Sequence, residues 1–60
     1  MTIDKTEVPE AVKTAFSQKY PTAQKVEWEM ETEGEYEAEF KMQGKVMSAN
    51  FKVDGIWLET

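Results

Sequence analysis

The chain has 60 residues and a formal net charge of −5, with 12 acidic residues against 7 basic ones. A chain of this length forms one small domain and buries only about 60% of its unfolded surface. It has no cysteine and no histidine, so it lacks the residues for the disulfides and structural zinc sites that usually stabilise small domains. The negative charge disfavours nucleic acid and anionic membranes as partners. We expect neither a signal peptide nor membrane insertion, because no suitable apolar run is present.

The first predicted element is an amphipathic helix over residues 9–19. Pro9 suits the first helical position, where its missing N–H would have no acceptor, and Pro21 predicts the end. A helix this short is not stable alone in water, so its apolar stripe must pack against another element. At helical spacing the stripe comprises Val8, Ala11, Val12, Ala15, Phe16 and Tyr20.

Beyond the helix the hydrophobic period changes to two, which predicts four strands over residues 24–31, 35–42, 45–53 and 56–60. The residues between consecutive strands are typical of turns. The first is a three-residue loop that ends at Gly34 in a left-handed conformation. Gln43-Gly44 and Asp54-Gly55 then form the second and third connections, of which Asp-Gly is a strong signal for a two-residue turn.

The registers set by these loops place the apolar residues of all four strands on one face. The loops pair Glu31 with Glu35, Met42 with Lys45, and Val53 with Ile56. The predicted face comprises Val26, Trp28, Met30, Tyr36, Ala38, Phe40, Met42, Met47, Ala49, Phe51, Val53, Ile56 and Leu58. Because a slip of one residue would reverse a strand, this agreement supports one fold. We predict a single α+β domain over residues 1–60, with one N-terminal helix on one face of a four-stranded antiparallel meander, order 1-2-3-4.

The aromatic residues of this interior are predicted to form the core, since each lies on the apolar face, and no ligand pocket is expected among them. They are Phe16, Tyr20, Trp28, Phe40 and Phe51.

The chain also resembles a known family. The segments concerned are Val8-Pro9-Glu10-Ala11-Val12 leading to Phe16, Lys19-Tyr20-Pro21-Thr22-Ala23, Val26 with Trp28, Tyr36-Glu37-Ala38-Glu39-Phe40, Gly44, Ala49-Asn50-Phe51, and Asp54-Gly55 with Trp57. Together they resemble the PepSY-like, β-lactamase-inhibitor-protein-like domains of bacterial cell-envelope proteins. The resemblance implies a helix on a four-stranded sheet, a periplasmic or secreted setting, and a non-enzymatic role in binding or inhibiting proteins.

Members of that family often carry a signal or lipoprotein peptide and two units in tandem, and this chain shows neither. Three interpretations therefore stay open: an excised repeat, an engineered or idealised unit, and a natural single-domain member.

The outer face of the predicted sheet concentrates acidic residues. They are Glu27, Glu29, Glu31, Glu35, Glu37 and Glu39, and the register opposes them in three like-charge pairs, which destabilise a sheet. Such a surface can bind a basic partner, or calcium through clustered carboxylates. The alternative is a solvated face that keeps the edge strand from pairing. Because no EF-hand loop is present, we predict no metal site and no cofactor.

A second predicted surface lies on the outer face of the last two strands. It comprises Trp57, Val46, Asn50 and Lys52, and is a candidate protein-binding surface because an exposed tryptophan can anchor an interface. We expect Lys52 to lie between Glu35 and Trp57, with its stem across the indole. The alternative is a local cover over the tryptophan. The last strand is also an edge, so a homodimer through it is predicted.

The residue inventory argues against an enzyme, since histidine, cysteine and arginine are missing and the serines have no histidine base. The predicted function is a non-enzymatic protein-binding or inhibitor-like module that uses the outer sheet face. The alternative is a structural unit with no partner beyond itself.

Overall fold

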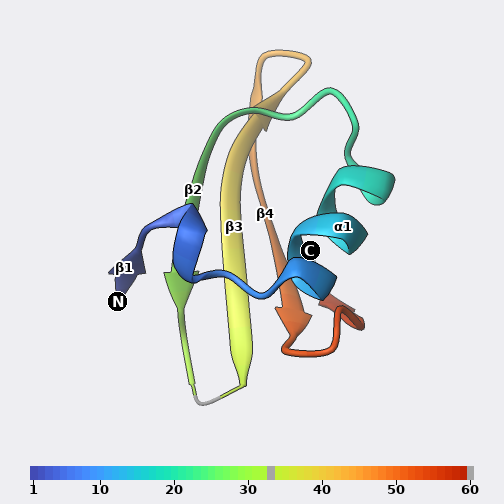
Figure 1. Ribbon diagram of the computed structural model, residues 1–60. Helices are drawn as coiled ribbons and strands as arrows, with labels where there is room; N and C mark the ends of the chain where they lie inside the picture. The colour runs from blue at the N-terminus through green and yellow to red at the C-terminus, as the bar shows by residue number, and fades with distance from the viewer. Residues whose placement is uncertain (33, 60) are drawn as a thin grey trace.

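The computed structural model describes residues 1–32 and 34–59. The elements are β1 (Thr2–Ile3), the 3-10 turn η1 (Lys5–Glu7), α1 (Glu10–Lys19), β2 (Gln24–Met30), β3 (Glu35–Met42), β4 (Lys45–Lys52) and β5 (Trp57–Glu59). The strands form one antiparallel sheet in the order β1-β2-β3-β4-β5, and α1 lies across one of its faces (Figure 1). The α+β class and the N-terminal helix are confirmed, whereas the sheet has five strands instead of the predicted four.

The additional strand is β1, which pairs with β2. Thr2 lies opposite Glu29, and Ile3 lies opposite Trp28. The N–H of Met30 donates to the carbonyl of Met1 at 2.8 Å, and the terminal amine donates to the Met30 carbonyl at 3.1 Å. β1 therefore covers the edge of β2, and Ile3 packs against the core.

The helix runs from Glu10 to Lys19 with Pro9 at its N-cap, one residue shorter than the predicted 9–19. Val12 and Phe16 are buried on the sheet side. Ala11 was predicted in the apolar stripe but is exposed, so the stripe is narrower than its spacing indicates. Across the described residues, no helix has the length and apolar character needed to cross a membrane.

Phe16 lies at the centre of the core. Its ring centroid is 5.0 Å from that of Phe40, 5.3 Å from Trp28 and 6.2 Å from Phe51, each at a steep interplanar angle. Edge-to-face contacts of this kind stabilise beyond the area they bury. The predicted aromatic core is confirmed, and the buried residues are Val8, Val12, Phe16, Tyr20, Trp28, Ala38, Phe40, Ala49 and Phe51.

The first two hairpins have the predicted registers. Trp28 lies opposite Ala38 in β2–β3, and Met42 lies opposite Lys45 in β3–β4. One departure occurs at the start of β2, where a register shift places Gln24 opposite Lys41 and Lys25 has a φ of 55°. The predicted pairing of Val26 with Phe40 is therefore absent from the ladder, although Val26 still packs against the core.

The third hairpin differs from its prediction. The N–H of Lys52 donates to the carbonyl of Ile56 at 2.8 Å, so the loop has three residues and the predicted pairing of Val53 with Ile56 is wrong. Gly55 supplies the left-handed residue with a φ of 91°, and its N–H donates to Lys52 O at 2.8 Å. Because the slip is one residue, the faces of β5 are exchanged.

The exchange changes what is buried. Phe51 lies opposite Trp57 instead of the predicted Leu58, and a further shift places Asn50 opposite Glu59. Val53, Ile56 and Leu58, which were predicted in the interior, are 49%, 55% and 39% exposed.

Gly55 also lies against the helix, which makes it a test of this loop. A Cβ on Gly55 would meet the carbonyl oxygen of Ala11 at 2.7 Å, whereas a Cβ on Gly34, with a similar φ of 82°, would meet nothing within 4 Å. We expect Gly34→Ala to cost about 1 to 2 kcal/mol of unfolding free energy from backbone strain. Gly55→Ala should cost about 1 to 3 kcal/mol more, because the helix must shift.

Urea unfolding of both variants measures the difference. Equal losses for Gly34→Ala and Gly55→Ala would contradict the contact between the β4–β5 loop and α1.

Candidate functional site

The face of the sheet turned away from α1 is open to solvent and carries the side chains that the core does not use. Val46 is 75% exposed there. The strands contribute Glu27 and Glu29 from β2, Glu35, Glu37, Glu39 and Lys41 from β3, and Val46, Ser48, Asn50 and Lys52 from β4. We call this the outer face.

Five of the predicted acidic residues occupy one half of the outer face, and Glu31 directly follows β2 beside them. We refer to the six as the glutamate field: Glu27, Glu29, Glu31, Glu35, Glu37 and Glu39. Glu27 lies opposite Glu39, and Glu29 lies opposite Glu37, which confirms two of the like-charge pairs. For the third, the N–H of Glu31 donates to the carbonyl of Glu35 at 3.2 Å. Such pairs repel one another across neighbouring strands.

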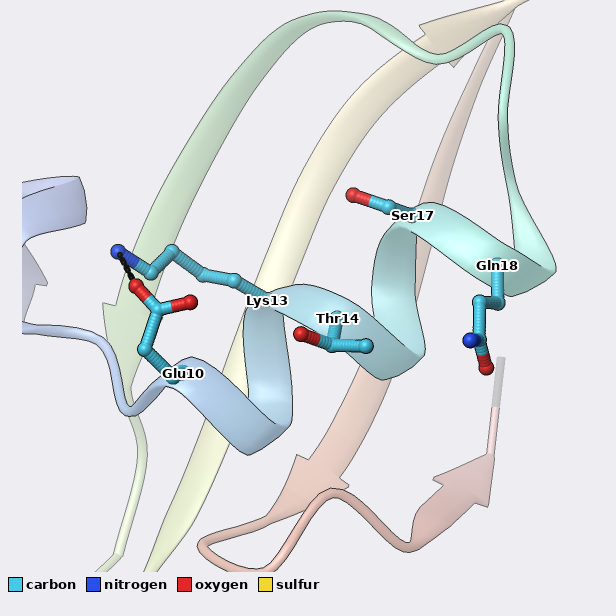
Figure 2. Close-up of a pocket in the computed structure, with 5 residues that line it drawn as sticks. All are labelled: Glu10, Lys13, Thr14, Ser17 and Gln18. Carbon is cyan, nitrogen blue, oxygen red and sulfur yellow. Dashed lines mark ion pairs between the residues drawn. The ribbon is translucent and has the colours of Figure 1, made fainter.

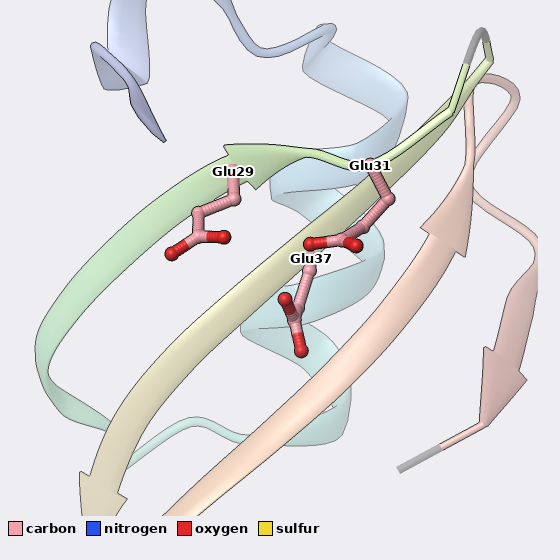
Figure 3. Close-up of side chains that lie close together, drawn as sticks. All are labelled: Glu29, Glu31 and Glu37. Atoms are coloured by element: carbon pink, nitrogen blue, oxygen red, sulfur yellow. The ribbon is translucent and has the colours of Figure 1, made fainter. Parts of the chain in front are cut away.

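Three of these side chains converge (Figure 3). Glu29, Glu31 and Glu37 each offer a carboxylate oxygen, and these oxygens all lie within 4.8 Å of one another. A hydrogen bond with the Glu31 carboxyl is the largest cause that raises the pKa of Glu37, to about 7. Partial burial and the negative charges of Glu31, Glu39 and Glu29 raise that pKa further in the same direction. Glu37 is therefore partly protonated near neutral pH, where its carboxyl is hydrogen-bonded to that of Glu31.

Little positive charge faces these carboxylates. Glu29 lies opposite Thr2, and Glu37 lies opposite Asn50, both uncharged. Lys52 lies opposite Glu35, as predicted, at the end of the field. The field is thus acidic across its middle, where β2 and β3 run side by side.

The chemistry of the trio is that of hard oxygen donors. Calcium takes six to eight oxygens, usually including loop carbonyls and waters. Glu29 lies in β2, Glu31 directly follows β2, Glu37 lies in β3, and all three offer carboxylates alone. Because Glu37 is partly protonated near neutral pH, the trio carries less negative charge there than three ionised carboxylates would. The predicted lack of a metal site stays a prediction.

The second predicted surface is not assembled as expected. Val46, Asn50 and Lys52 lie on the outer face, but Trp57 lies opposite the buried Phe51 and therefore faces the helix side. Lys19 of α1, and not Lys52, covers the indole, with its Nζ 4.3 Å from the ring centroid. The physical reason is the three-residue loop, which turns Trp57 to the other face.

Lys19 was missed in the sequence. It lies three residues after Phe16, and this helical spacing is the signal that could have placed it on the sheet side. Its stem and charge over Trp57 form a cation–π contact at the end of α1.

The polar side of α1 carries a shallow hollow (Figure 2). It is lined by Glu10, Lys13, Thr14, Ser17 and Gln18. The Lys13 Nζ lies 3.2 Å from the Glu10 carboxylate, one helical turn away, and Glu10 is exposed whereas Lys13 is half-buried. This hollow lies on the solvated face of an amphipathic helix.

Comparison with family models, with curated proteins and with solved structures finds no match to this chain. The resemblance to PepSY-like domains therefore stays a prediction, and so do the setting and the role that it implies.

The raised pKa of Glu37 makes stability depend on pH. The pKa of Glu37 is raised from 4.5 to about 7 in the folded chain, so between these values the folded state holds more protons than the unfolded state. Stability should fall as the pH rises through this window. Glu37→Gln should remove that loss and raise the unfolding free energy at about pH 8 by a few tenths to about 1 kcal/mol.

Urea unfolding at about pH 5 and about pH 8 measures this effect. Glu27→Gln is the matched control, because it removes the same charge from the field outside the trio. A Glu37→Gln profile that keeps the wild-type pH dependence would contradict the raised pKa of Glu37.

Proposed function

We propose that this protein is a non-enzymatic binding module, of inhibitor-like type, whose outer face binds a basic segment of another protein. The observation that carries the proposal is the glutamate field, held on an open sheet face with uncharged residues opposite its middle. The proposal accords with the PepSY-like resemblance, and with it we propose a periplasmic or secreted setting.

Spacing supports an extended partner. Side chains on one face of a strand repeat about every 6.6–6.8 Å. Glu35, Glu37 and Glu39 follow this repeat on β3, and Glu27 and Glu29 run beside them on β2. An extended segment with lysine or arginine at alternate positions has the same period, so its charges can match those of the field one by one.

The other half of the outer face supplies contacts of a different kind. Val46 offers an exposed apolar side chain, and Ser48 and Asn50 offer hydrogen-bonding groups beside it. Interfaces combine apolar area with polar groups in this way. The acidic half would attract and orient the partner, and the β4 half would contact it directly. Trp57 has no part in this surface, because it faces the helix side.

A cation on the field would also displace the proton of Glu37. The neighbouring carboxylates raise the pKa of Glu37 to about 7, and a lysine or arginine beside them would lower it. Binding should therefore release protons near neutral pH and weaken with added salt.

The test uses a synthetic peptide of alternating lysine and serine, with backbone amide shifts of the labelled protein as the readout. We expect saturable shifts confined to β2, β3 and β4. Glu37→Lys should weaken binding about tenfold or more at low salt, since it reverses a charge at the centre of the field.

Glu10→Lys on α1 is the control, because it makes the same charge change on the other side of the molecule. A peptide of equal composition with consecutive lysines tests the spacing and should bind less tightly. If Glu37→Lys and Glu10→Lys weaken peptide binding equally, the binding depends on net charge and not on the glutamate field. Lack of saturable binding would leave the protein as a structural unit.

A further inference from the structure

A second surface lies at the edge of the sheet formed by the last hairpin. Four of the exposed large apolar side chains fall within residues 53–58: Val53, Ile56, Trp57 and Leu58. We call this the hairpin edge. Exposed apolar residues that occur singly need no explanation, but a group of them marks an interaction site.

We infer that a second copy of this chain docks on the hairpin edge and forms a symmetric dimer. The inference is independent of the proposed partner on the outer face, because it uses different residues. It depends on where the charges of the molecule lie and on how β5 is built.

The distribution of charge favours a contact between two copies at β5 over a contact at β1. Strands lie about 4.8 Å apart, so the glutamate fields of two copies joined at β5 lie about five strand spacings, or 24 Å, from each other. This exceeds the Debye length of about 8 to 10 Å, so salt screens their repulsion. At the opposite edge β1 pairs directly with β2, and the two fields would lie about 14 Å apart.

The charges beside the hairpin edge are of mixed sign. Lys19 covers the indole of Trp57, and Lys52 precedes the loop. The acidic residues are Asp54, which accepts a hydrogen bond from the Ile56 N–H at 3.2 Å, and Glu59, which ends β5. A chain with a net charge of −5 can therefore meet its copy here with less repulsion than along the glutamate field.

The short and irregular β5 indicates that the two copies pack through their side chains. It does not favour backbone pairing that would continue the sheet from one copy into the other. β5 spans three residues, and its pairing with β4 shifts register between Asn50 and Phe51. Such irregularity discourages another strand from pairing at the edge. The apolar side chains on either side of β5 remain exposed and can pack against those of a copy.

The area available sets the expected strength. A stable interface buries about 800 Å² on each partner, close to a fifth of this protein's 4114 Å² surface. Four partly exposed side chains supply less than that, so the dimer should be weak and should dissociate on dilution.

Sedimentation of the full chain from about 10 µM to about 1 mM tests the inference. We expect the average mass to rise from 6.9 kDa toward twice that value. Leu58→Lys should raise the concentration of half-association about tenfold, because it places an unpaired charge in the contact. Val46→Lys makes the same change on the outer face and should leave association unaltered.

Ile56→Lys is the second variant if Leu58→Lys fails to fold, which circular dichroism detects. A mass of 6.9 kDa at every concentration would overturn the inference and leave the hairpin edge to a different protein. Equal loss of association in Val46→Lys would also overturn it, because the outer face would then be the contact.

Discussion

The structure depends on the contact between one short helix and one face of the sheet. The chain has no cysteine or histidine for a disulfide or a structural zinc site, and α1 is too short to be stable alone. Phe16 makes this contact, with its ring among Trp28, Phe40 and Phe51. Ala38 and Ala49 lie opposite each other in the central strands and are fully buried, so the middle of the core face of the sheet carries small side chains. The helix and sheet must therefore form together.

The same arrangement leaves the other face of the sheet to solvent, and this explains the outer face in physical terms. One helix can cover only one side of a sheet. The uncovered side must be polar, and in β2 and β3 it is polar through glutamates that face one another. The resulting repulsion is a cost that solubility alone does not require, since lysines could have alternated with the acids. A partner with positive charge would relieve the cost.

Much of this fold could be predicted from the sequence, because period and loop chemistry act locally. The helix, β2 to β4 and the opposed glutamates follow from alternation and from the loops at Gly34 and Gly44. β1 has only two residues and therefore no period to detect. Asp54-Gly55 fits loops of two or of three residues, and here the longer loop forms where Gly55 approaches the helix carbonyl of Ala11. The convergence of Glu29, Glu31 and Glu37 depends on side-chain conformation, which strand register does not determine.

The two tryptophans lie in surroundings different enough to act as separate optical probes. Trp28 is 6% exposed against Phe16, whereas Trp57 is 44% exposed beneath the ammonium group of Lys19. The emission of Trp28 should follow loss of the core, and a nearby cation and water should make that of Trp57 follow the position of the hairpin. Fluorescence of the unmodified chain can thus separate loosening of one edge from collapse of the whole, with no label attached.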